Sequence, residues 1–387
     1  MRPFLVAILF SFFGLSIVAQ SDSTVNKKVQ VSGYLKFLQG NYTVQQSSLI
    51  SDQLIHQRLN FKQKLNKNHE WIAEFRNRIF FGQLVQLNQL QGKYLDQIDP
   101  NANRLFKPDI GWESKKGIAA LIALDRAYWQ WTPKDWELRL GRQRVNWGIS
   151  TIWNPNDIFN AYGFTDFDYE ERPSVDGLRI KRFIGYSGSL EAVASVGKDF
   201  SDMSYGIMYK TNVKSYDLQF LAGYSDQNYA FGMGTAGNLG LAGLKAESTA
   251  FVPENGGQTS LATTFAIDYT LSGGTYLSVG GLYNSEGNTT GDLSTLFSFE
   301  LSARNLYPYK WAALASVQQQ VSPLSALGLV AVYSPVRSQA LFLNPSFSYS
   351  IAQAWDIDVI AQLAFSQNVQ KYESSLMGFF LRLKWSY

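Results

Sequence analysis

Arginine side chains recur near the middle of five segments in which apolar and polar residues alternate. They are Arg58, Arg76, Arg126, Arg139 and Arg179, and each falls on the polar face of its segment. A guanidinium group is always charged and binds carboxylate or phosphate oxygens in a bidentate way. If the segments are neighbouring strands, the arginines form a band at one height that favours anions. The alternative is that these charges pair with nearby acids and only fill and brace an interior. The same faces carry three further candidate lining residues, Arg78, Lys181 and Glu74.

The second candidate for chemistry is the segment 141–173, which is dense in aromatic and acidic residues. So large an apolar surface in a loop seeks burial, so we expect this loop to fold inward and to narrow the space that it enters. Its carboxylates would then face the arginine band, and the field between them would orient dipolar solutes. The alternatives are a plug with internally satisfied salt bridges and a partner-binding loop. The candidate loop residues are Trp147, Trp153, Asn154, Asp157, Asp166, Asp168, Glu170 and Glu171.

Strands must hold these residues, because the alternation that surrounds them has the two-residue period of a β-strand. The last segment shows it best: Phe379, Leu381 and Leu383 share one face, and Arg382 and Lys384 share the other. One face can meet lipid while the other meets water, as in a transmembrane β-barrel. A soluble sandwich also alternates, but it seldom places leucines and aromatic residues on the outward face of nearly every strand.

The alternating segments predict an all-β protein, a transmembrane antiparallel β-barrel of eighteen strands, with sixteen as the fallback. Three connections, 85–118, 148–173 and 287–310, are long and fall on one side of the barrel, whereas all the turns on the other side are short. If 229–252 were a single strand, the third long loop would change sides. The expected strands are 28–44, 52–66, 70–84, 119–131, 136–147, 174–184, 188–197, 203–213, 216–226, 229–238, 241–252, 258–271, 275–286, 311–322, 325–334, 339–351, 355–366 and 376–387.

The first nineteen residues have the pattern of a cleaved signal peptide: Arg2, an apolar run over 4–18, and the small residue Ala19. We therefore expect 20–387 to form a single barrel in the outer membrane of a Gram-negative cell. The 387 residues include no cysteine, which fits export to an oxidising compartment. The formal net charge is only +3, which argues against a nucleic-acid partner.

Catalytic and metal-binding patterns are not evident. The chain has two histidines, and His69 lies in a predicted turn far from His56, so a paired-histidine metal site is not expected. A lipid-facing serine–histidine dyad is not expected either, because His56 is predicted to face the lumen. Asp96, Asp99 and Asp109 share one loop but match no calcium-ligand spacing, and solvated acids explain them better. We expect no enzyme activity and no cofactor.

The segment 141–173 also carries a resemblance. Gly141-Arg142-Gln143, Trp147-Gly148, Trp153-Asn154-Pro155 and the acidic run 166–173 resemble a family of uncharacterised porin-like outer-membrane barrels of Bacteroidota. More distantly, the chain is similar to eighteen-stranded alginate-export porins, whose lumen is lined by arginines. The resemblance implies passive transport through an outer membrane. It transfers no substrate, because acids share the candidate constriction of this chain.

These observations predict a porin-like channel in contact with membrane lipid. Its arginine-lined lumen would attract small polar or anionic solutes, such as acidic sugars, and its acidic aromatic loop would filter them. The alternative is a non-conducting binding or assembly barrel within an envelope complex. The sequence does not determine the solute or the oligomeric state.

Overall fold

The computed structural model describes residues 29–44, 48–90, 92–99, 104–163, 172–199, 202–291, 299, 301–368 and 371–387. The predicted signal peptide, residues 1–19, lies outside these ranges.

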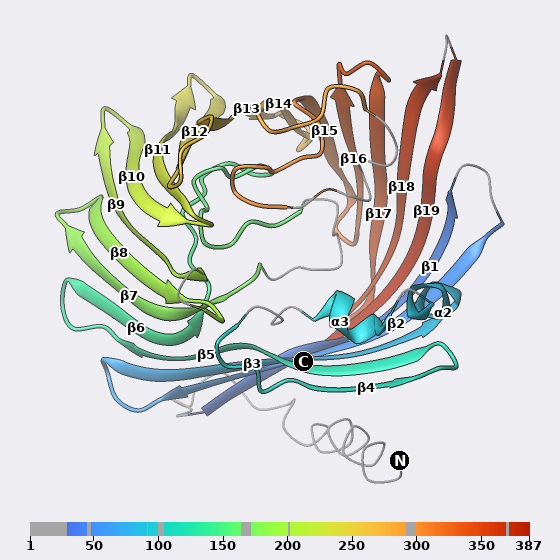
Figure 1. The fold of residues 1–387 in the computed structure, drawn as a ribbon, viewed down its shortest axis with the longest axis horizontal. Helices are drawn as coiled ribbons and strands as arrows, with labels where there is room; N and C mark the ends of the chain where they lie inside the picture. Colours follow the sequence, from blue (N-terminus) through green and yellow to red (C-terminus); the bar gives the residue numbers. More distant parts are fainter. Residues whose placement is uncertain are drawn as a thin grey trace.

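Eighteen antiparallel strands pair in chain order, and β1 pairs with β19, so the sheet closes on itself (Figure 1). The predicted fold and strand count are confirmed, and most strand ends agree within two residues. Closure removes the free edges that an open sheet would present. The barrel strands are β1 (Val29–Val44), β2 (Ile50–Lys64), β3 (His69–Gly82), β5 (Ile118–Trp131), β6 (Trp136–Gln143), β7 (Val175–Ile184), β8 (Gly188–Val196), β9 (Ser204–Val213), β10 (Tyr216–Ser225), β11 (Asn228–Leu239), β12 (Ala242–Pro253), β13 (Ser260–Thr270), β14 (Tyr276–Asn284), β15 (Trp311–Ser322), β16 (Ser325–Ser334), β17 (Ala340–Ala352), β18 (Trp355–Asn368) and β19 (Lys371–Ser386).

Alternation along each strand sorts the residues between two faces. On β11, Phe231 and Met233 are more than half exposed on the outer face, whereas Ala230, which precedes Phe231 and lies on the inner face, is fully buried. The same outward apolar positions recur on the other strands, for example at Phe265 and Phe379. Such an apolar belt is what a barrel in lipid requires. Among the described residues, no helix is long and apolar enough to cross a membrane.

The two ends of the barrel differ. At one end the turns are short, and Lys214 and Ser215 between β9 and β10 both adopt the positive φ of a tight hairpin turn. At the other end lie the long connections 83–117, 144–174 and 285–310. As the loop lengths predicted, all the long connections share one end, which we call the loop end.

The first long connection contains structure that was not predicted. It forms two short helices, α2 (Gln83–Gln89) and α3 (Tyr94–Ile98), and a short strand, β4 (Ile110–Ser114), which pairs with the part of β5 nearest the loop end. Val85 and Tyr94 of the helices pack against Phe80 and Ala119 on the inner wall. This connection therefore covers part of the inner wall at the loop end.

Candidate functional site

The five arginines of the predicted band, which we call the arginine row, do lie on neighbouring strands, β2, β3, β5, β6 and β7. Two of them meet a carboxylate that strand phase assigns to the outer face. Glu74 pairs with Arg126 and Phe75 pairs with Leu124, so Asp125 is the extra residue of a β-bulge. The bulge lets Asp125 and Arg126 both turn inward.

Asp125 joins the first two arginines of the row. Its carboxylate accepts hydrogen bonds from Arg76 Nε at 3.0 Å and from Arg58 Nη1 at 2.5 Å. Glu74 lies between two other guanidinium groups, because it pairs with Arg58 and, at 3.2 Å, with Arg126. Arg58 and Arg76 are only 1% and 4% exposed. These two arginines therefore brace the wall and offer little surface to a solute.

A second network joins β6, β7 and β8. Arg179 binds Glu137 at 2.8 Å, and it binds both carboxylate oxygens of Glu191 at 2.8 and 2.9 Å. Arg139 lies 3.3 Å from the same Glu137. The indole Nε1 of Trp147 donates to Glu191 at 2.8 Å, so the network extends from the wall to the loop that follows β6.

Several cations of this arc remain accessible. The side chains of Arg126 and Arg139 are 20% and 24% exposed, and both share their acids with other arginines. Three further cations have no carboxylate oxygen within 4 Å among the described residues: Arg144, Lys181 and Lys210. Counted over the described residues, the arc from β5 to β9 therefore carries surplus positive charge. Of the remaining predicted lining residues, Arg78 donates to the Ile98 carbonyl at 3.1 Å and thereby packs against α3.

The segment 144–163, which we call the inward loop, leaves the wall after β6 and crosses the interior, as predicted (Figure 1). Trp147 is fully buried, and Ile158 and Phe159 pack with it against Met208 and Leu221 of the wall. The loop therefore packs against β8 to β12. The first three arginines of the row lie on other strands, β2, β3 and β5.

Glu247 on β12 holds the inward loop by its backbone. Its carboxylate accepts hydrogen bonds from the N–H groups of Ile149, of Ser150 at 2.5 Å and of Asn156 at 3.1 Å. Gln219 on β10 adds a bond from its amide to the Trp147 carbonyl at 2.7 Å. A carboxylate is well suited to this position because a charged acceptor binds several N–H donors strongly.

Glycines in the wall make room for the loop. A Cβ on Gly232 or Gly234 of β11 would lie 2.6 or 2.9 Å from the side-chain amide of Asn156. That amide also donates to the Met233 carbonyl at 3.1 Å and accepts from Thr249 Oγ1 at 2.6 Å. Asn156 thus occupies a cradle that exists only because two inward positions lack side chains.

Asp157 is the one candidate acid of the loop that lies within the described residues. It is fully buried, and its nearest base is Arg172 at 3.7 Å, which belongs to the same connection and not to the arginine row. Burial raises the pKa of Asp157 to about 7, against the opposing effects of Arg172 and Arg144. Asp166, Asp168, Glu170 and Glu171 lie outside the described residues, so the predicted opposition of acids and arginines stays a prediction.

A second connection also folds inward. Residues 301–310 place Leu306, Tyr307 and Tyr309 in a buried cluster with Leu314 and Val332 of the wall. The rings of Trp153 and Tyr307 meet edge to face, with 5.7 Å between their centroids. Two loops that are separate in sequence therefore touch inside the barrel. Asn154, which follows Trp153, closes the next turn, because its backbone carbonyl accepts the Asp157 N–H at 3.1 Å.

The roles of Asp125 and Glu247 and the inward course of 301–310 were not predicted from the sequence. Asp125 has no signal in the alternation, because a bulge shifts the phase without altering composition. The aromatic run of Tyr307 and Tyr309 around a proline could have indicated burial. The glycines at 232 and 234 could likewise have indicated close approach to an inward strand face.

Comparison with known proteins identifies the architecture. No protein-family model matches the chain, and no curated protein sequence matches it. Among solved structures, the outer membrane protein OprD from Pseudomonas aeruginosa superposes with a TM-score of 0.57 at 8% identity, over 93% of this chain and 94% of that one. OpdQ from the same organism gives 0.59 at 9% identity, over 93% and 97%. OpdK, solved with vanillate, gives 0.54 at 10% identity, over 92% and 98%.

These likenesses show the fold, a closed eighteen-stranded barrel like those of outer-membrane proteins. At such low identity they carry no residue roles to this chain. The resemblance of segment 141–173 to Bacteroidota barrels, and the distant similarity to alginate-export porins, remain predictions.

Proposed function

We propose that this chain is a passive, non-enzymatic channel in the outer membrane of a Gram-negative cell, and that it favours small polar or anionic solutes. The apolar outer belt supports the membrane location, because only lipid or another apolar surface can cover so many outward leucines and aromatic residues. The fold shared with OprD supports the same location.

The uneven charge of the interior supports the solute preference. Arg126 and Arg139 share their acids and are partly exposed, and Arg144, Lys181 and Lys210 lack an ion pair among the described residues. Cationic rings and arcs of this kind favour anions in pores. OpdK, a structural neighbour, was solved with vanillate, which carries a carboxylate. That ligand is consistent with the proposal but does not define the solute of this chain.

Planar-bilayer recording tests the proposal. The purified barrel should give stable openings with a preference for chloride over potassium in a salt gradient. Two unit charges about 6 Å apart in water interact by about 0.7 kcal/mol, so Arg126→Ala or Arg139→Ala should lower the anion preference about threefold. Lys371→Ala removes an exposed cation at the loop end of β19 and serves as the control.

The inward loop supplies a second arm of this experiment. Deletion of residues 150–168 should raise the conductance if this loop narrows the channel. A folded barrel that never opens, and that copurifies with an envelope partner, would instead support the non-conducting alternative and overturn the channel.

A further inference from the structure

Arg144, at the start of the inward loop, has a guanidinium group to which no acceptor is bound. Among the described residues it makes no hydrogen bond and has no carboxylate oxygen within 4 Å, and its Nε is buried without a partner. Arg142, two residues earlier, binds both oxygens of Asp176 at 2.7 and 2.8 Å and the Leu124 carbonyl at 2.9 Å. A buried donor without an acceptor costs free energy, so the open guanidinium of Arg144 indicates an acceptor that comes from outside the chain.

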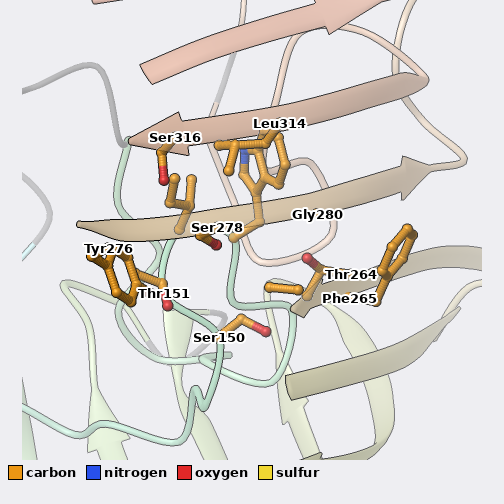
Figure 2. A pocket seen from close by; sticks show the side chains of 12 residues that line it. Ser150, Thr151, Thr264, Phe265, Tyr276, Ser278, Gly280, Leu314 and Ser316 are labelled. Carbon is orange, nitrogen blue, oxygen red and sulfur yellow. The ribbon is translucent and has the colours of Figure 1, made fainter. Parts of the chain in front are cut away.

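Arg172 holds a second guanidinium group at the other end of the same connection. It stacks on the Tyr162 ring, 3.7 Å from the ring centroid, and its Nη2 donates to the Tyr162 hydroxyl at 2.5 Å. That hydroxyl donates in turn to the Thr151 carbonyl at 3.3 Å, in the part of the inward loop that lies against β13 to β15 (Figure 2). Stacking fixes the plane of a guanidinium group, so the remaining N–H donors of Arg172 have a set direction.

Three guanidinium groups act on one another at this place. Burial lowers the pKa of Arg144 below its usual range, and the positive charge of Arg172 lowers this pKa further. Arg126 on the wall acts in the same direction, and its own acid, Glu74, is shared with another arginine. The side chains of Arg126 and Arg172 are 20% and 17% exposed, so a solute inside the barrel can reach them.

Asp157 offsets these charges only in part. Its Oδ2 lies 3.7 Å from Arg172, and neither of its carboxylate oxygens has a hydrogen-bond partner among the described residues. Because its pKa is about 7, this carboxyl group is only partly ionised at neutral pH. With Glu74 shared and Asp157 partly neutral, the three arginines keep a surplus of more than one positive charge.

We propose that Arg126, Arg144 and Arg172 bind a dianionic tetrahedral oxyanion, such as the phosphate group of a phosphate monoester, an inference that rests on the proposed channel function and specifies its solute class. Guanidinium groups bind such oxygens through paired, charge-assisted hydrogen bonds. A dianion matches a surplus of more than one charge, whereas a monoanion would leave part of it uncompensated. Inorganic sulfate has the same chemistry and is a suitable probe, because it stays doubly charged between pH 6 and pH 8.

Equilibrium dialysis of radiolabelled sulfate against the full-length barrel in detergent micelles at low ionic strength tests the site. One sulfate should bind per barrel, about tenfold more tightly than acetate, which has one charge fewer. Arg144→Gln should weaken sulfate binding about tenfold, since it removes hydrogen bonds from a charged donor. Arg337→Gln removes an exposed arginine between β16 and β17 and is the matched control, so it should leave sulfate binding unchanged.

The pH dependence of sulfate binding reports on Asp157. The charged and titratable groups that face this acid are Arg172, Arg144, Tyr162 and, from β12, Glu247. As the pH rises from 6 to 8, Asp157 ionises and adds a negative charge beside Arg172, so sulfate should bind about fivefold more weakly at pH 8. Asp157→Asn should remove this difference, and a difference that persists in the variant would overturn the placement of the anion beside Asp157.

Other outcomes would overturn the site or separate it from the channel. Sulfate binding that is no tighter than acetate binding, or that falls equally in Arg337→Gln, would overturn the site even if the barrel conducts. Sulfate binding by a barrel that never conducts would keep the site and overturn the channel. Slow gel mobility without heating confirms that each variant is folded before dialysis. The site is also overturned if sulfate binds only after four acids of the same connection are changed to their amides, because these acids would then occupy the arginines: Asp166, Asp168, Glu170 and Glu171.

Discussion

The seat of the inward loop can be tested most directly by replacing Glu247 with glutamine. The carboxylate accepts three backbone N–H bonds: Oε1 accepts those of Ile149 and Ser150, and Oε2 accepts that of Asn156. Glutamine has a single side-chain oxygen, so it can replace only one of these two carboxylate oxygens. The other side becomes an amide that faces an N–H donor, which costs about 1–3 kcal/mol. Each hydrogen bond that remains has a neutral oxygen as its acceptor in place of a carboxylate, which weakens it by about 1 kcal/mol. The sum is about 4 kcal/mol, a factor of about a thousand in the population of the unseated loop.

Hydrogen exchange measured by mass spectrometry reads that population directly. In Glu247→Gln, the peptide that covers 147–160 should exchange about a thousand times faster, whereas the strand peptides of β12 and β13 should keep their protection. Glu373→Gln makes the same chemical change at an exposed position on β19 and is the matched control. Unchanged exchange of the 147–160 peptide in Glu247→Gln would refute the idea that this carboxylate holds the loop. The same variant should also show noisier channel currents.

Two other variants test the seat from different sides. Gly234→Val would place a Cβ 2.9 Å from the Asn156 amide, and it should weaken the seated state by about 1–3 kcal/mol in the same exchange assay; Gly328→Val, where a new Cβ meets only a flexible serine hydroxyl, should not. Burial raises the pKa of Asp157 to about 7, so the seated protein keeps a proton that the unfolded chain releases above about pH 4. The contribution of Asp157 to stability should therefore fall as pH rises from about 4 to 7, and Asp157→Asn should reduce the pH dependence of thermal unfolding between pH 5 and pH 8. An equal slope in the variant would assign the pH dependence to another group.

The barrel could be predicted from the sequence because its strongest signal is repeated eighteen times. Each strand alternates independently, so an error at one end, such as the predicted extension of β6 to residue 147, leaves the others intact. The loop lengths then showed which connections lie at which end of the barrel, because a miscounted strand would have placed a long connection among the short turns. The inward direction of Arg58, Arg76 and Arg126 followed from the same phase.

The partners of those arginines could not be predicted by phase. Asp125 reaches the interior through a bulge, and one extra residue reverses the face of everything before it. Glu247 sits about a hundred residues from the loop that it holds, and nothing local to either segment encodes that pairing. The helices α2 and α3 are short and have no marked start or stop signals, so the 85–118 connection looked like plain loop.

The seat of the inward loop has a consequence for the order of folding. Its anchors on β11 and β12 lie roughly 80 to 100 residues after the loop in the sequence, so the loop cannot dock until those strands have joined the sheet. Backbone pairing should therefore precede burial of the indole, and the nascent barrel should pass through a stage with a wide, water-filled interior. The final narrowing of the lumen is then a late step that reports completion of the wall.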